Sequence, residues 1–552
     1  MAMATLRRPL TAAAATVIGL GVLAGCSGAS PGAAAPGAAT PVAGGKLSFA
    51  LDQEPSCFDP HVSPADVTAV IQRGVYDSLV YQDSSGAFHP WLATSWKISP
   101  DGRVYTFQLR DDVKFTDGTA FDAQAVKVNF DSINAAATKS EYASALFGQY
   151  YVGTKVDGPD TVEVDFSRAF TPFLQAASTT YLGIASPKSL SQNASHLCAG
   201  GSYSVGSGPF VESGRVPGQS VTFTRNPGYA WGPQGTGHTG PAYLSGYTID
   251  FLPDDSTRVG ALTSGQVDAA VIPVTAVKTV KADSQLAYVA HESPGIVYSL
   301  QLNQARAPLS DERVREALLD ASDVPALVNA VYFGLYQPAW SPLSPSTPGG
   351  TYDSALNNSW GNNQTEAVQL LEQAGYTSIN AQGYRTKNGV PLTLHWIYIA
   401  ESQTDERDTL GQALVAQFKK VGVDLERDVV TEGTYFTDIE KGDYDVLDLS
   451  WARGDADILR GFYHSASTAV QGSEDASNTR DPQVDAWLDQ ADSDVSTAQA
   501  AADYRDVQAW TIQHAVVLPL YVTEYQLGVS TRIHGLQYDV SGSPEFYGAW
   551  VA

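Results

Sequence analysis

Residues 392–425 read LTLHWIYIAESQTDERDTLGQALVAQFKKVGVDL and contain the clearest local pattern in the chain. Residues 392–396 alternate apolar and polar side chains, which predicts a strand. An apolar face with helical spacing follows: Leu410, Leu414, Phe418 and Val421. Gly422 stands where helices commonly stop, and residues 423–425 become extended again. The stretch therefore predicts a strand–helix–strand unit, which is typical of α/β folds.

Segments on both sides of this unit show the same mixture of patterns. Residues 105–110 and 161–166 alternate with period two, as half-buried strands do. Another helical face follows Ser310, a residue type that caps helix N-termini: Val314, Leu318 and Ala321. No repeat of solenoid period is present. We predict the α/β fold class, and 552 residues at 43% hydrophobic content are enough for two or three domains.

The charge balance indicates which binding partners the protein can have. The chain has 33 basic and 59 acidic residues, which gives a formal net charge of −26 at pH 7. Nucleic-acid binding needs clustered Lys and Arg to neutralise phosphates, so we expect no nucleic acid as a partner. An acidic excess fits an exported protein and favours cationic ligands.

The N-terminus predicts export and a lipid anchor. Arg7 and Arg8 precede an uncharged run at residues 10–23, and small residues then lead to Cys26. The run is shorter than the roughly twenty residues of a membrane-spanning helix and has the layout of a secretory signal. We predict a lipoprotein signal peptide at 1–25, lipidation of Cys26, and anchoring on the outer, extracytoplasmic face of the cell membrane. A signal peptide followed by a chance cysteine is the alternative.

Two further features concern the exported part of the chain. Residues 27–45 hold seven Ala, five Gly and three Pro without a charge, so 26–45 is predicted to be a flexible tether. Cys57 and Cys198 are the only cysteines after Cys26. A pair in an exported protein predicts a disulfide, with two buried free thiols as the alternative.

Seven segments, in one order, carry a family resemblance. The densest is PWLATSWKISPDGRVYTFQLRDDVKFTDGTAFDAQAVKVNF at 90–130. The others are LDQEPSCFDPH at 51–61, GSGPF at 206–210, PLSDERVREALLDA at 308–321, and residues 367–376, 442–459 and 516–521. From about residue 45 onward the chain resembles the family 5 extracellular solute-binding proteins of ABC importers, the oligopeptide, dipeptide and nickel type.

The resemblance implies a type II periplasmic-binding-protein fold, with two lobes around a ligand cleft and an extra inserted domain. Carried onto this sequence, it divides the chain into lobe I, inserted domain II and lobe III: 46–75 with 200–295 and 515–552, then 76–199, then 296–514. Cys57 and Cys198 would bridge the edges of the inserted domain.

The resemblance also implies a ligand-proximal segment at 442–459, which includes Trp451. Peptide-binding relatives hold the ammonium group of the peptide with an aspartate just after this Trp. Here the third position after Trp451 is Gly454, and Asp455 follows it. Either Asp455 takes over the role or the ammonium site is absent. Asp455 and Asp457 could instead cap the helix that follows.

Three more residues are candidates for ligand binding. Arg453 either pairs with one of the neighbouring aspartates or receives a ligand carboxylate. His61 opens a loop that in relatives lines the cleft floor, and Tyr142 stands where some relatives project a tyrosine over the peptide. A purely structural role in core or surface is the alternative for His61 and Tyr142.

The sequence contains no recognisable motif for catalysis or metal binding. The only GxSxG lies in the tether at 28–32, no glycine-rich segment continues into Gly-Lys-Ser/Thr, and the nine His residues form no HExxH. We expect a monomeric receptor rather than an enzyme, with no cofactor and no metal site. Its expected partners are a peptide or small-molecule ligand and ABC permease subunits. A nickel-chelate or oligosaccharide receptor and an exported hydrolase are the alternatives.

Overall fold

The computed structural model describes residues 40–552 except 401–402, 468–474 and 495. The predicted signal peptide, Cys26 and most of the tether lie outside the described residues. Among the helices that are described, none has the length and apolar content needed to cross a bilayer.

A seven-stranded sheet contains the first strand of the described chain and a strand close to its end. Its order is β12-β21-β11-β1-β10-β9-β8. The strands are β1 Lys46–Leu51, β8 Phe210–Val216, β9 Ser220–Arg225, β10 Gly246–Phe251, β11 Ala269–Val271, β12 Leu286–Glu292 and β21 Glu524–Ser530. Helices α5 (Asp255–Thr263) and α6 (Val277–Ala282) belong to this part. The parallel pairs β1–β10 and β1–β11 form its centre.

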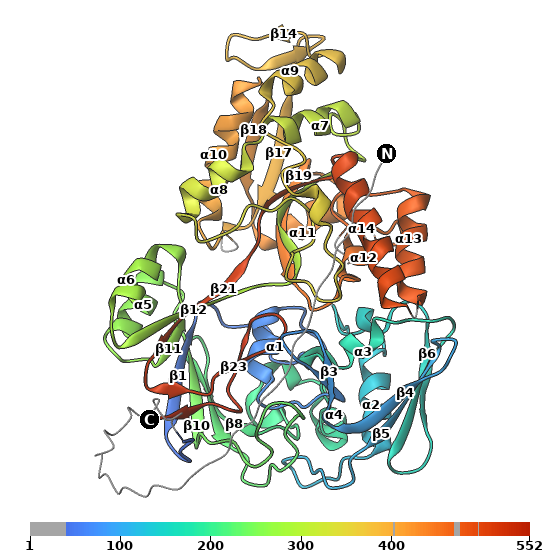
Figure 1. Ribbon diagram of the computed structural model, residues 1–552, viewed down its shortest axis with the longest axis vertical. Helices are drawn as coiled ribbons and strands as arrows, with labels where there is room; N and C mark the ends of the chain where they lie inside the picture. The colour runs from blue at the N-terminus through green and yellow to red at the C-terminus, as the bar shows by residue number, and fades with distance from the viewer. Residues whose placement is uncertain (1–39, 401–402, 468–474, 495) are drawn as a thin grey trace, which may run out of the picture. The chain divides into compact units, whose positions relative to one another are not determined.

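A five-stranded sheet of order β18-β17-β19-β13-β20 forms the second main part. Its strands are β13 Gly295–Leu302, β17 Thr393–Tyr398, β18 Asp424–Val429, β19 Val446–Ala452 and β20 Val517–Tyr521. Its helices are α7 Glu312–Ala321, α8 Val324–Tyr332, α9 Gln364–Gln373, α10 Arg407–Lys420, α11 Glu432–Lys441, α12 Ile458–Tyr463, α13 Pro482–Ser493 and α14 Thr497–Gln513. Figure 1 shows α8 and α10 beside β17 and β18. The predicted strand–helix–strand unit is β17, α10 and β18.

A four-stranded antiparallel sheet of order β4-β5-β7-β6 forms the third part. Its strands are β4 Ala93–Ile98, β5 Val104–Leu109, β6 Tyr151–Val156 and β7 Thr161–Phe166, with α2 at Ala123–Ile133. Tyr105, Phe107, Val162 and Val164 are buried, as the period-two alternation predicts. Their side chains give this sheet an aromatic-rich core with Phe130.

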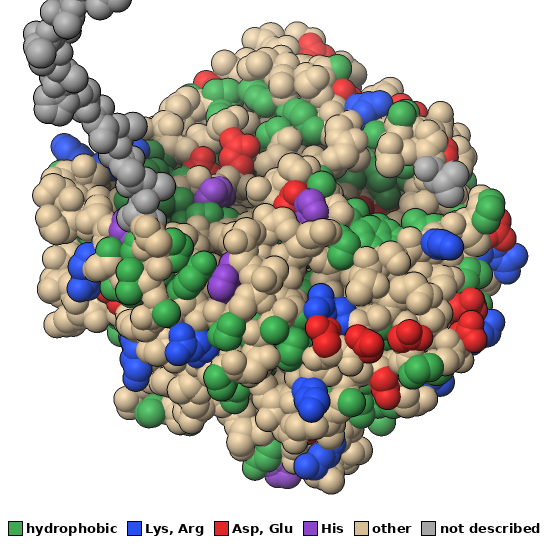
Figure 2. Space-filling model, turned by 60° about the horizontal axis from the view of Figure 1, so that its bottom comes forward, with side chains coloured by type: hydrophobic (Ala, Val, Ile, Leu, Met, Phe, Trp, Pro, Cys, Tyr) green, Lys and Arg blue, Asp and Glu red, His purple; other side chains and the backbone are tan. Residues whose placement is uncertain are grey.

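The remaining elements are short. They are α1 Asp66–Gln72, α3 Phe173–Ala176, α4 Pro187–Asn193, β2 Val80–Gln82, β3 Phe88–Pro90, β14 Ser378–Ile379, β15 Arg385–Lys387, β16 Val390–Pro391, β22 Ile533–His534, β23 Gln537–Tyr538, β24 Pro544–Glu545 and β25 Trp550–Val551. Single 3₁₀ turns are Ala145–Phe147, Thr180–Leu182, Leu197–Ala199, Gly201–Tyr203, Val274–Ala276 and Ser354–Leu356. On the face drawn in Figure 2, acidic and basic side chains are interspersed and apolar ones form small groups.

The chain passes twice between the two largest sheets. It leaves β12 for β13 through residues 293–294 and returns from β20 to β21 through residues 522–523. The limits of the lobes stay a prediction, but one strand at their edge lies in a different sheet from the one expected. Val517–Tyr521 was expected in lobe I, but this strand pairs with β13 in the five-stranded sheet.

Local details agree with the sequence patterns, with one correction. A disulfide joins Cys57 to Cys198, whose Cα atoms lie 4.2 Å apart. Gly422 follows the last turn of α10 with a φ of +85°, a conformation that glycine adopts without strain. The helix expected after Ser310 begins at Glu312, and its N-cap is Asp311. The Asp311 carboxylate accepts the backbone N–H of Arg313 and so takes the capping role from Ser310.

Candidate ligand-binding site

A cavity of about 330 Å³ is lined by residues of both large sheets and of α1. The loop after β1, the start of β21 and the end of β19 all contribute to its wall. Six acidic residues line it: Asp52, Asp66, Asp405, Glu524, Asp539 and Glu545. Three arginines do so as well: Arg73, Arg407 and Arg453. Its size falls in the range of small-ligand pockets, and its lining is strongly charged and mainly acidic.

Arg453, directly after β19, lines the cavity and contacts several neighbouring side chains. Its Nε donates to the Tyr142 hydroxyl over 2.7 Å, and its Nη1 donates to Asp66 Oδ1 over 2.5 Å. The guanidinium lies over the rings of Tyr142 and Trp451, 4.3 and 4.4 Å from their centroids. Arg453 is only 7% exposed, and its Nη2 has no hydrogen-bond partner among the described residues. The side chain is fixed by its neighbours and retains an unused donor.

A second charged group lies in the wall formed by α1, β2 and β24. The Tyr81 hydroxyl donates to Glu545 Oε2 over 3.2 Å, and Arg73 Nε lies 3.7 Å from Glu545 Oε1. Asp539 accepts from the backbone and side chain of Ser541. Burial raises the pKa of Glu545 to about 7 and also raises the pKa of Asp539. The Arg73 guanidinium thus lies near two buried carboxyl groups, those of Glu545 and Asp539.

A further group of charged lining residues lies near the start of α10. Arg407 donates from Nε to the Tyr521 hydroxyl over 3.2 Å and from Nη2 to Ser450 Oγ over 3.0 Å. Burial raises the pKa values of Asp405 and Glu524, which also line the cavity. Acidic groups therefore occur in both of these charged groups, and Arg453 pairs with a further acid of the lining, Asp66.

Tyr142 and Trp451, two of the candidates named from the sequence, meet at Arg453. Their ring centroids lie 5.2 Å apart, and both rings flank the guanidinium. Neither side chain lines the cavity among its described residues. Both residues therefore position Arg453, while their own contact with a ligand stays a prediction.

Asp455 and Asp457 line a neighbouring pocket that they share with Arg453 and Tyr142. Asp455 Oδ1 accepts the backbone N–H of Asp457 over 2.7 Å. Asp457 occupies the N-cap position of α12, but its carboxylate makes no capping bond there. It accepts instead from Arg460 Nε and the Tyr504 hydroxyl, each over 3.3 Å. These contacts tie Asp457 to the protein, and an ammonium-binding role for Asp455 stays a prediction.

His61 does not contribute to the cavity wall. It is 2% exposed, and its Nε2 lies 2.8 Å from the carbonyl oxygen of Gly183. Within the predicted cleft-floor loop, residues 61–68, the cavity is lined by Asp66 and Val67 at the start of α1. The loop thus supplies lining residues, although His61 itself is a core residue.

The titration of Asp455 gives a testable pH dependence. Burial, followed by the charge of Asp457, raises the pKa of Asp455 to about 7. The folded chain then binds this proton more tightly than the unfolded chain, so the contribution of Asp455 to stability falls between about pH 4 and pH 7. We expect Asp455→Asn to raise the melting temperature relative to wild type at about pH 8 and to have little effect at about pH 4. Thermal melts of both proteins across this pH range measure the difference in melting temperature. The exposed Asp111→Asn is the control and should show no such change with pH. A difference between Asp455→Asn and wild type that is the same at every pH would contradict the prediction.

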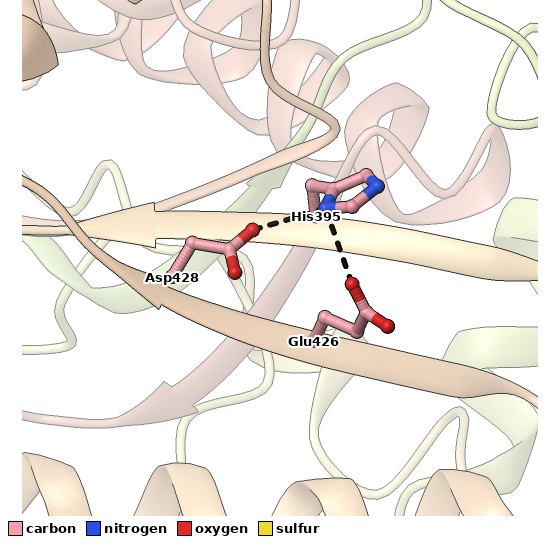
Figure 3. A group of neighbouring side chains, drawn as sticks. All are labelled: His395, Glu426 and Asp428. Carbon is pink, nitrogen blue, oxygen red and sulfur yellow. Dashed lines mark hydrogen bonds and ion pairs between the residues drawn. The ribbon is translucent and has the colours of Figure 1, made fainter.

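One group of possible metal ligands exists within the described part of the chain, outside the cavity. His395 on β17 pairs in register with Glu426 on β18, and Asp428 follows on the same face (Figure 3). His395 Nδ1 lies 2.9 Å from Asp428 Oδ2 and 3.6 Å from Glu426 Oε2. Imidazole and carboxylate together suit a divalent transition metal. All three side chains are more than 40% exposed, so water and the His395 contacts suffice to stabilise the carboxylates.

Comparison with known proteins decides the family. Residues 87–473 match the family model described as "Bacterial extracellular solute-binding proteins, family 5 Middle". The chain belongs to this family. This family 5 protein is 28% identical over 478 residues to the nickel-binding periplasmic protein of Escherichia coli K12, covering 84% of this chain and 86% of that one. It is also 28% identical over 443 residues to protein XP55 of Streptomyces lividans, covering 79% and 76%.

Solved structures confirm the fold of this family 5 protein. The oligopeptide-binding protein AppA of Bacillus subtilis, in complex with a nonapeptide, has a TM-score of 0.79 at 20% identity. That match covers 93% of this chain and 100% of AppA. NikA of Brucella suis, in complex with Fe(III)-EDTA, has a TM-score of 0.78 at 24% identity, covering 92% and 100%. The predicted type II periplasmic-binding-protein fold is therefore correct, and the family is one of binding proteins.

Proposed function

We propose that this family 5 protein is the receptor subunit of an ABC importer, acts as a monomer, and captures short peptides in the cavity around Arg453. The observation that carries the proposal is the unused Nη2 donor of this buried guanidinium. A planar guanidinium whose other atoms are fixed suits a carboxylate, and every unmodified peptide ends in one. Relatives named for peptide, dipeptide and nickel binding support a small charged solute as the ligand class.

Closure of the two lobes is the proposed mechanism. The large sheets are joined only by residues 293–294 and 522–523 within the described chain, and such paired crossings act as hinges in two-lobed receptors. Arg453 from the five-stranded part contacts Asp66 of α1, so closed lobes share contacts across the cavity. A ligand that touches both walls favours the closed state by its differential affinity for it. The closed receptor then docks on the permease, which another protein powers with ATP.

Thermal shift against a peptide library tests the ligand class. We expect melting temperatures to rise with peptides of two to a few residues that end in a free carboxylate. Native mass spectrometry of protein purified from its own host would identify the ligand directly and show it intact, as expected of a receptor rather than a hydrolase. No stabilisation by any peptide, together with a response to nickel chelates or oligosaccharides, would overturn the peptide assignment in favour of those alternatives.

The lipid anchor is proposed to keep the receptor beside its permease without taking part in binding. Diacylation of Cys26 would give stable membrane attachment, because two acyl chains hold far better than one. We expect Cys26→Ser to move the protein from the membrane fraction to the soluble exported fraction. Ligand affinity measured on the released protein should equal that of the detergent-solubilised wild type. Retention of the Cys26→Ser protein in membranes would refute this.

A further inference from the structure

Three side chains on two adjacent parallel strands converge at a point outside the cavity. His395 on β17 pairs in register with Glu426 on β18, and Asp428 follows on the same face (Figure 3). One ligand atom from each of these residues lies within 4.8 Å of the other two. Backbone hydrogen bonds between the two strands fix the spacing of the three residues. We call these three residues the triad.

The two carboxylates of the triad are balanced by a single imidazole. Among the described residues, Glu426 and Asp428 form ion pairs with His395 alone. Arg427 lies between them in β18, but its side chain is on the opposite face, where it pairs with Asp408 of α10. A protonated imidazole carries one positive charge and so balances only one of the two carboxylates. A divalent cation in the same place balances both.

The distances within the triad match those between ligands of a transition-metal ion. His395 Nδ1 lies 2.9 Å from Asp428 Oδ2 and 3.6 Å from Glu426 Oε2. Two ligands that each lie about 2.1 Å from a zinc ion, at a tetrahedral angle, are about 3.4 Å apart. At these distances a proton on Nδ1 forms a hydrogen bond with Asp428 but not with Glu426. A metal ion between the three atoms bonds to all of them.

We infer that the triad His395, Glu426 and Asp428 is a binding site for a divalent transition-metal ion such as Zn²⁺. Nδ1 of the neutral imidazole and one oxygen of each carboxylate supply three ligands, and water completes the tetrahedral coordination. The bound ion joins β17 to β18, the edge strand of the five-stranded sheet. All three side chains are exposed, so a hydrated ion reaches them without any opening of the fold.

This inference goes beyond the proposed function, because the site lies apart from the ligand cavity. None of the triad residues lines the cavity around Arg453 among the described residues. The sequence was expected to hold no metal site because no motif within one segment indicated one. The triad is instead assembled from two strands that α10 separates along the chain, so only their pairing brings the ligands together.

Titration calorimetry with zinc chloride, on protein first treated with a chelator and then freed of it, tests the site. We expect the wild-type chain to bind one Zn²⁺ ion at the triad. His395→Gln should weaken this binding at least about tenfold, because losing even an outer-shell partner of a metal ligand costs about 10- to 100-fold in affinity. Glu426→Gln and Asp428→Asn should each have a similar effect. The matched control His514→Gln removes a part-exposed histidine that pairs with one carboxylate, that of Glu312, and should leave the affinity unchanged.

Thermal melts separate loss of the site from loss of folding. Because the ion binds the folded chain, Zn²⁺ should raise the melting temperature of wild type and His514→Gln but not that of His395→Gln. Metal-free variants that melt close to wild type show that the lost binding comes from the site. Zn²⁺ affinity that is the same in wild type and in all three triad variants overturns the inference, and so does a wild-type chain that binds no Zn²⁺. Peptide binding is expected in either case, so the proposed function is tested separately.

Discussion

Arg453→Ala is expected to weaken binding of a peptide with a free C-terminal carboxylate by about 2–5 kcal/mol, as for other buried charge pairs that lose one partner. The guanidinium is buried, stacked on Tyr142 and Trp451, and bonded to Asp66. Replacing Arg453 removes the donor proposed to bind the ligand carboxylate and leaves Asp66 without its cationic partner. Titration calorimetry with the peptide that gives the largest thermal shift measures the loss.

A C-terminally amidated peptide supplies the control for this prediction. Amidation removes the carboxylate, so it should weaken binding to the wild-type protein and have little further effect on Arg453→Ala. Arg453→Lys keeps the charge but loses the planar fork and is expected to lie between the two. If amidation costs the variant as much affinity as the wild type, Arg453 does not bind the carboxylate.

Arg460→Met is expected to lower the stability of the five-stranded part by about 3–5 kcal/mol, the usual cost of removing one partner of a buried ion pair. Arg460 on α12 contacts Asp492 over 2.6 Å, Asp489 over 3.2 Å and Asp457 over 3.3 Å. Asp492 is fully buried, and burial together with the charge of Asp457 raises its pKa. Without Arg460, Asp457 and Asp492 lose the cation that they share, while Asp489 keeps its contact with Arg168.

Denaturant unfolding followed by fluorescence measures this loss. The matched change Arg480→Met removes a more exposed guanidinium that pairs with Asp475, and it provides a comparison for an arginine with fewer carboxylate partners. The double change Arg460→Met with Asp492→Leu should recover part of the lost stability, because it also removes the buried acid. Equal stability of Arg460→Met and the wild type would show that the network is energetically neutral.

Local periodicity predicted the elements, but it could not predict the cavity. The unit at 392–425 and the strand at 161–166 follow from side-chain alternation, and the structure contains them as β17–α10–β18 and β7. The cavity wall joins Asp66, Gln526 and Glu545, from opposite ends of the chain. Each is an isolated polar residue in its own segment, so only the folded topology shows that they belong together.

The family resemblance supplied candidate site residues for a different reason. It placed Tyr142 and Arg453 near the ligand, and the structure joins them by a hydrogen bond, although their role in binding stays a prediction. It also named His61, which the fold buries against Gly183. A motif gives the position of a residue in the chain but not the direction of its side chain, which depends on packing. The N-cap Asp311 differs from the expected Ser310 because two neighbouring cap-forming residues compete for one helix end.

Because β13 pairs with β20, the chain enters and leaves the five-stranded part at neighbouring strands. Tyr298 stands opposite Tyr521, so the strands by which the chain enters and leaves this part lie side by side in one sheet. A segment whose ends are adjacent can be exchanged between related proteins without disturbing its host. Chimaeras joined at 293–294 and 522–523 would therefore combine the seven-stranded part of this receptor with the five-stranded part of another. Recombination at these two points would replace one side of the cavity while keeping the other, and would so change the ligand specificity in a single event.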